Sequence, residues 1–158
     1  MSTSYTDSYR SINFRTHPEK YRVGRGEQGV LITQPYKDEL LPHWRFKTPA
    51  IAEVSAKRLY AMFEAYIKDE NFVGADMARK FLMMGWTRSR RYANHASGRK
   101  YDAKKRVTPQ DENSETSIKA ESARIFFEYY SKAKDNEQYK AMKAAWLTRE
   151  KTLFSAPK

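Results

Sequence analysis

Apolar positions recur with helical spacing through the middle of the chain. After residue 48, Ala52, Ala56 and Leu59 follow an i, i+4, i+7 pattern that continues to residue 67. This spacing puts the apolar side chains on one face of an amphipathic helix of about five turns. Thr48 followed by Pro49 is a typical helix start. The pattern therefore predicts a helix that begins at Pro49.

Similar patterns predict further helices towards the C-terminus. One runs from about residue 72 to 84 and ends at Gly85, because glycine adopts the left-handed conformation that terminates helices. A short helix over 88–94 follows, and a longer one has apolar positions from Ile118 to Ala133 on one face. The last begins at Asp135, where the sequence Asp-Asn-Glu-Gln matches a capping box.

The N-terminal part of the chain has a different pattern. Residues 1–15 are rich in Ser, Thr and Tyr and are expected to form a flexible arm, and residues 16–158 a single globular domain. Two strand-like runs flank a glycine-rich turn in residues 21–33, which predicts a small β-hairpin. Residues 35–46 contain prolines and are expected to be extended or irregular. The predicted fold is mainly α (α+β), with three to five helices packed around an aromatic core and a small N-terminal β-hairpin.

Charge is concentrated in one segment. Residues 79–106 hold ten Lys or Arg residues and one acid, Asp102, and so carry +9 of the net charge of +11. Trp86, Tyr92 and Tyr101 lie among these cations. Localised positive charge with interleaved flat rings is typical of proteins that bind nucleic acid.

A nucleic-acid site is therefore predicted in this segment. Its cations would neutralise phosphates while aromatic rings stack on exposed bases, and Arg79 and Lys80 are expected to face outward from their helix. The candidate contacts are Arg79, Lys80, Trp86, Arg88, Arg90, Arg91, Tyr92, Arg99, Lys100, Tyr101, Lys104, Lys105 and Arg106. The alternative is that these cations pair internally with acids such as Glu53, Glu64, Asp69, Glu70 and Asp76.

Residues 24–29 satisfy the pattern G-x-G-x-x-G, which in nucleotide sites lets backbone amides approach phosphates. A dinucleotide site needs a helix after this loop, whereas Val30–Thr33 is strand-like. A structural turn is therefore favoured. An auxiliary phosphate contact by Arg22 and Arg25 is the alternative, and a nucleotide cofactor is a lesser one.

Catalytic and metal chemistry have little support in the sequence. The three histidines are isolated from one another, and no nucleophile motif is present. Asp76 with Asp102 and Lys104 faintly resembles the carboxylate and lysine order of metal-dependent nucleases. We expect no catalytic residue, no metal and no cofactor, and Asp76 is expected to pair with Arg79 or Lys80 on its own helix.

Composition limits the environment of the chain. With no cysteine, disulfides and thiolate metal sites are excluded. The N-terminus has no apolar signal region, and no apolar run is long enough to cross a membrane. These observations predict a cytoplasmic protein without membrane contact.

Several stretches resemble a known family. They are the runs at residues 17–30, 41–47, 76–81 and 91–95, within a similarity that covers roughly residues 14–150. The family consists of small bacterial and phage proteins catalogued as a domain of unknown function. The resemblance implies a single domain and a phage or bacterial setting, and it implies no activity.

Three functions follow as hypotheses. The first is a non-enzymatic nucleic-acid-binding protein that uses the basic, aromatic-interleaved segment. The second is a protein-interaction factor that docks this segment on an acidic protein surface, as a modulator of a host machine or a virion component. The third is a metal-dependent nuclease. The choice of DNA, RNA or protein as partner and the oligomeric state are left open by the sequence.

Overall fold

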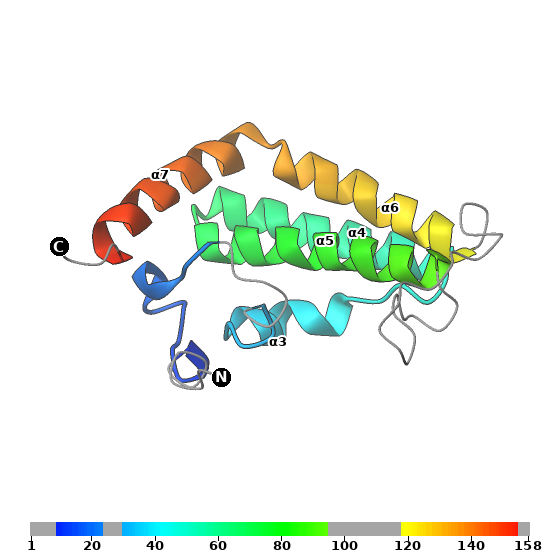
Figure 1. Cartoon of the computed structure of the whole chain (residues 1–158), viewed down its shortest axis with the longest axis horizontal. Coiled ribbons are helices and arrows are strands. Elements are labelled where there is room, and N and C mark those ends of the chain that lie inside the picture. Colours follow the sequence, from blue (N-terminus) through cyan, green and yellow to red (C-terminus); the bar gives the residue numbers. More distant parts are fainter. Residues whose placement is uncertain (1–8, 24–29, 95–117, 155–158) are drawn as a thin grey trace, which may run out of the picture.

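Three long helices lie side by side in the computed structural model, which describes residues 9–23, 30–94 and 118–154 (Figure 1). Helix α4 spans Pro49–Lys68, α5 spans Phe72–Asn94 and α6 spans Ile118–Lys134. α5 packs against both α4 and α6, which also contact each other. The expected Thr48 cap is confirmed, because its hydroxyl accepts a hydrogen bond from the Ile51 amide at 3.2 Å. The mainly helical fold is likewise confirmed.

Helix α7, Glu137–Phe154, turns away from α6 and leads back towards the N-terminal segment (Figure 1). Its cap is Asn136 rather than the expected Asp135, since the Asn136 side chain accepts from the Tyr139 amide at 2.8 Å. Further along α7, the Trp146 indole donates to the Tyr21 carbonyl at 2.9 Å. Through this hydrogen bond the C-terminal helix α7 contacts the N-terminal segment.

The predicted β-hairpin over residues 21–33 is wrong. Residues 21–23 and 30–33 form no strand, and the β pairing in the described residues is one isolated bridge between Asn13 and Gln34. Tyr21, Val30 and Ile32 are instead buried in the core that the helices form. Their strand-like composition reflects burial against helices rather than pairing with each other. The glycine-rich residues 24–29 lie outside the described residues.

The stretch expected to be irregular, residues 35–46, contains helix α3 (Tyr36–Leu40) and the 3-10 turn η2 (Leu41–His43); a further 3-10 turn, η1, covers Pro18–Lys20. A proline is tolerated where a helix begins, because the amide it lacks has no intrahelical partner there. Pro35 occupies this position, and the Gln34 side chain accepts from the Asp38 amide at 3.1 Å. Trp44 and Phe46 then pack against the core.

The core is aromatic, as the sequence predicted. Fully buried rings come from the N-terminal segment, α4, α5, α6 and α7, among them Phe14, Tyr21, Phe63, Phe81, Phe126 and Tyr139. Residues 1–8 of the expected arm lie outside the described residues, and from Tyr9 onward the segment contributes to this core. None of the helices within the described ranges is both long and apolar enough to span a membrane.

Gly85 does not end a helix, because α5 continues through it to Asn94. A Cβ atom at this position would lie 2.3 Å from Cδ1 of Phe126 on α6. The glycine therefore allows α5 and the Phe126 ring to approach closely. Packing between two helices, rather than termination of one, explains this residue.

Candidate nucleic-acid interface

Asp76 is a fully buried carboxylate in the second turn of α5, and protein groups contact both of its oxygens. Oδ1 accepts from the Tyr139 hydroxyl at 2.6 Å and from Arg79 Nε at 3.1 Å. Oδ2 accepts from the Tyr21 hydroxyl and lies 3.5 Å from Lys80 Nζ. These five residues, which we call the Asp76 cluster, join the N-terminal segment, α5 and α7.

Arg79 and Lys80 do not face outward as expected, since they are 8% and 3% exposed. Positions i, i+3 and i+4 share one face of a helix, so both cations point towards Asp76. Every residue from Phe72 to Leu82 is buried, because α5 is the central helix and is covered on all sides here. Internal pairing is confirmed for these two residues, and they present no charge to a ligand at the surface.

The electrostatics of the cluster follow from burial and pairing. Burial raises the pKa of Asp76, but the charges of Arg79 and Lys80 and the two tyrosine hydroxyls outweigh it and hold that pKa below its ordinary value. Burial also lowers the pKa of Lys80, which Asp76 offsets in part. Two cations share one carboxylate, so the cluster depends on Asp76 remaining ionised.

Acid stability should report this dependence. Because the pKa of Asp76 is lower in the folded than in the unfolded state, its contribution is present above the unfolded value of 3.8 and is lost as the pH falls below it. We expect the free energy of unfolding, from urea titrations between about pH 6 and pH 2.5, to fall less steeply in Asp76→Asn than in the wild type. Parallel profiles would show that the carboxylate carries no such linkage.

The nuclease hypothesis depended on the same carboxylate. Both oxygens of Asp76 already accept from protein donors, and Asp102 and Lys104 lie outside the described residues. Within the part of the chain that the structure describes, no three acidic or histidine side chains are placed to hold a metal ion. The geometry therefore gives Asp76 a structural role.

Trp86 is less accessible for stacking than its basic surroundings suggested. Its ring lies 4.7 Å from the Phe127 ring and 6.0 Å from the Tyr130 ring, both on α6. These contacts place the indole in the α5–α6 interface, where it is half-buried. Tyr92, one turn and a half further along α5, is 39% exposed.

The second half of α5 brings its cations to one end of the bundle, where they meet cations from two other segments. The Arg88 guanidinium lies 5.7 Å from the ring centre of Trp44. Lys119, in the first turn of α6, lies 5.9 Å from the ring centre of Tyr92 and donates to the Lys47 carbonyl at 2.8 Å. We call this group the basic end; it consists of Arg45, Lys47, Arg88, Arg90, Arg91 and Lys119.

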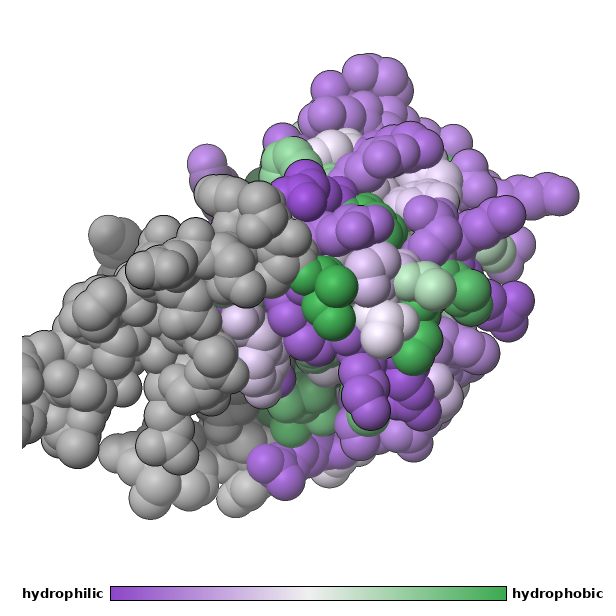
Figure 2. Space-filling model, turned by 90° about the vertical axis from the view of Figure 1, so that its right-hand side faces the viewer, coloured by the Kyte–Doolittle hydropathy of each residue, from purple (hydrophilic) through white to green (hydrophobic). Residues whose placement is uncertain are grey.

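Figure 2 looks directly at this end of the molecule, with hydrophilic side chains surrounding a few apolar ones. Arg45, Lys47 and Arg91 are exposed, and Arg88, Arg90 and Lys119 are partly so. The first turns of α4 and α6 present the positive ends of their helix dipoles here, whereas α5 ends here at Asn94 and presents a negative one. Two carboxylates lie on the helices that begin here. Glu53 on α4 accepts a hydrogen bond from the Tyr129 hydroxyl at 2.6 Å, and Glu121 lies in the first turn of α6.

The remaining predicted contacts are placed only in part. Arg22 is half-buried, with Nε 4.0 Å from a carboxylate oxygen of Glu150 on α7. Arg25 lies outside the described residues, as do the cations and ring of the predicted loop, Arg99, Lys100, Tyr101, Lys104, Lys105 and Arg106. The segment that carries this loop is attached at the basic end, since it leaves α5 at Asn94 and enters α6 at Ile118.

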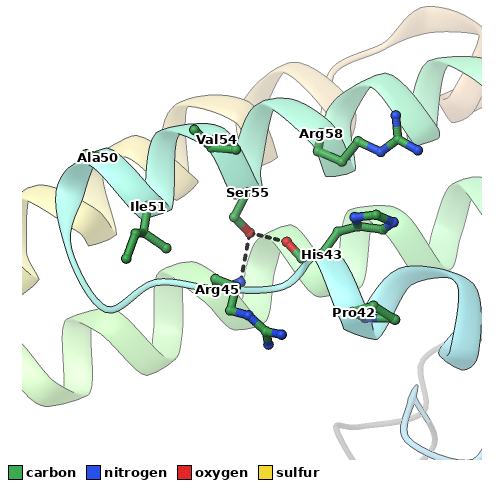
Figure 3. A pocket seen from close by; sticks show the side chains of 8 residues that line it. All are labelled: Pro42, His43, Arg45, Ala50, Ile51, Val54, Ser55 and Arg58. Carbon is green, nitrogen blue, oxygen red and sulfur yellow. Dashed lines mark hydrogen bonds between the residues drawn. The ribbon is translucent and has the colours of Figure 1, made fainter.

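An apolar groove of about 580 Å³ lies beside the basic end (Figure 3). One wall is the first three turns of α4 and the other is the chain from Pro42 to Arg45. Ser55 joins the walls, because its hydroxyl accepts from the Arg45 amide at 2.9 Å and donates to the His43 carbonyl at 2.6 Å. The lining residues are Pro42, His43, Arg45, Ala50, Ile51, Val54, Ser55 and Arg58.

Sequence reasoning missed Arg45, Lys47 and Lys119. Arg45 and Lys47 alternate with the rings of Trp44 and Phe46, which is a short local signal of the kind seen in residues 79–106, whereas no charge cluster marks Lys119. Their proximity to α5 depends on the packing of the 43–48 segment and of α6, which only the tertiary structure shows. The hydrogen bond from Lys119 to Lys47 joins positions 72 residues apart.

The comparisons with known proteins concern the family of the chain. No curated protein and no solved structure matches it significantly. A family model described as "Domain of unknown function (DUF4385)" matches residues 4–149, which is nearly the whole sequence. The resemblance seen in the sequence is thereby confirmed, and the chain belongs to the DUF4385 family.

Proposed function

We propose that this protein binds nucleic acid through its basic end. The observation that carries the proposal is the convergence of cations from three separate segments, residues 45–47, 88–91 and 119, on one end of the bundle. Localised positive charge attracts the phosphate backbone regardless of sequence. Tyr92, with its exposed ring beside Lys119, is the described residue best placed to stack on a base.

Chain connectivity adds to this support. The most basic stretch, residues 99–106, belongs to a segment whose two ends are both attached at the basic end. The buried Arg79 and Lys80 and the packed Trp86 are no longer part of the proposed surface. The proposal therefore rests on the exposed residues of the basic end together with the cations of that segment.

A salt titration tests the proposal. With about six phosphates contacted, the logarithm of the affinity should fall with the logarithm of salt concentration with a slope of about −5 on duplex DNA and about −4 on single strands. Fluorescence anisotropy with labelled single-stranded DNA, single-stranded RNA and duplex DNA measures this. Absence of binding to all three at low salt would overturn the proposal.

A matched pair of variants locates the surface. Lys47→Ala with Arg91→Ala should weaken binding at least tenfold and make the salt slope less steep by about 2, because each phosphate contact contributes roughly one unit. Lys20→Ala with Lys68→Ala changes the net charge equally, but these exposed lysines lie away from the basic end. Equal loss in both variants would show that only net charge matters.

A further inference from the structure

The apolar groove beside the basic end exposes side chains that folding leaves in water. Val54 is 71% exposed and Ile51 is 39% exposed, one turn apart on the same face of α4 (Figure 3). Arg58 follows at the next position of that face and extends along the groove. Contiguous exposed apolar surface with a polar rim is typical of interaction sites.

The groove is fixed in shape before anything binds. Ser55 is buried, and its two hydrogen bonds hold the backbone of residues 43–45 against α4. α4 itself is anchored by Ala52 and Ala56, which are fully buried in the core. A preformed groove avoids the cost of ordering its walls on binding.

The rim determines the charge of the occupant. His43, Arg45 and Arg58 line the groove, and no acidic residue lines it among the described residues. The neighbouring Glu53 reaches α6 instead, where it meets Tyr129. An occupant with carboxylates complements this rim, whereas a second copy of a chain with net charge +11 would bring cations against cations.

The lining also favours a peptide over a nucleobase. Single-stranded nucleic acid binds through aromatic rings on which bases stack, but the apolar lining here is aliphatic. The nearest indole, Trp44, packs inward at 5.1 Å from Phe46 and 5.6 Å from Phe81. Aliphatic floors between cations instead suit the apolar side chains of an amphipathic segment.

We propose that this groove docks an acidic amphipathic segment of a partner protein. A large apolar side chain of that segment lies on Ile51 and Val54, and its flanking carboxylates pair with Arg45 and Arg58. This interaction goes beyond nucleic-acid binding and uses a neighbouring surface that shares Arg45 with the basic end, so the protein would connect a nucleic acid at its basic end with an acidic protein at α4.

The test uses fluorescein-labelled synthetic peptides of about 14 residues and the full chain. The first peptide is glutamate-rich with Leu and Phe at helical i, i+4, i+7 positions, the second replaces Leu and Phe by Ser, and the third replaces Glu by Lys. We expect the first to bind at least tenfold more tightly than the other two. In ¹H–¹⁵N spectra its shifts should be confined to residues 42–58.

Two variants separate this proposal from the nucleic-acid proposal. The double variant Ile51→Ser with Val54→Ser should lower the affinity for the first peptide at least tenfold. Its affinity for DNA should stay within about twofold of the wild type, because both positions are exposed and uncharged. Lys47→Ala with Arg91→Ala should do the reverse. Equal affinities for the first and second peptides would overturn the docking proposal. So would chemical-shift changes in residues 42–58 that DNA causes and the peptide does not. Neither result would contradict nucleic-acid binding at the basic end.

Discussion

Asp76→Ala is expected to lower the free energy of unfolding by about 3–5 kcal/mol, which is the usual effect of removing one partner of a buried ion pair. The loss is large because Arg79 and Lys80 would remain buried without their shared counter-ion. The hydroxyls of Tyr21 and Tyr139 would also lose their acceptor. Since ordinary domains have only about 5–15 kcal/mol of stability, unfolding should be evident in thermal and urea titrations followed by circular dichroism.

Two comparisons show whether the effect arises from buried charge. Glu128→Ala removes an exposed carboxylate from its i, i+4 pair with Lys132 and should cost less than about 0.5 kcal/mol. Combining Asp76→Ala with Arg79→Met and Lys80→Met removes the uncompensated charges and should recover much of the loss. If the single variant were as stable as the wild type, the cluster would not hold the three segments together.

The helices could be predicted because their patterns are local. Thr48 and Pro49 mark the start of α4 by their own chemistry, and its apolar stripe follows from one buried face. The local sequence could not correct the β-hairpin, because a short apolar run such as residues 30–32 does not by itself distinguish a strand from another buried segment. Tyr21, Val30 and Ile32 are buried against helices that come later in the chain.

For the candidate site too, the features that depend on local sequence could be predicted and those that depend on tertiary packing could not. The basic character of the second half of α5 follows from its sequence, and Arg91 and Tyr92 are exposed there. The burial of Arg79 and Lys80 follows from α5 being the central helix, which the amphipathic pattern of a surface helix does not anticipate. Asp76, three and four residues before these cations, was the local signal that they pair internally.

Gly85 matters for the packing of α5 on α6. The ring of Phe126 occupies the space that a side chain at residue 85 would need. That contact sets the separation of the two helices whose ends carry Arg91 and Lys119. We therefore expect a larger residue at position 85 to affect both the stability of the protein and the arrangement of cations at the basic end.

Gly85→Ala is expected to destabilise the protein by about 1 kcal/mol net, because the gain of about 1 kcal/mol in helix propensity offsets part of the cost of overpacking. A Cβ atom 2.3 Å from the buried Phe126 ring forces the ring or the helices to move, and overpacking of this kind typically costs about 1–3 kcal/mol. Urea titrations measure the change. Ala61→Gly, on the exposed side of α4, reports the helix-propensity effect alone.

A double-mutant cycle isolates the contact. Phe126→Leu alone should be destabilising, because it leaves a void beside Gly85. When Phe126→Leu is combined with Gly85→Ala, the smaller leucine side chain should relieve the clash with the new Cβ atom. The double variant should therefore be more stable than the sum of the single changes predicts, by an interaction energy of about 1–3 kcal/mol. Additive effects would mean that α5 and α6 are not held at this distance by Gly85 and Phe126. If the separation of α5 and α6 also positions the cations of the proposed nucleic-acid surface, the salt slope should be less steep in Gly85→Ala and should return towards the wild-type value in the double variant.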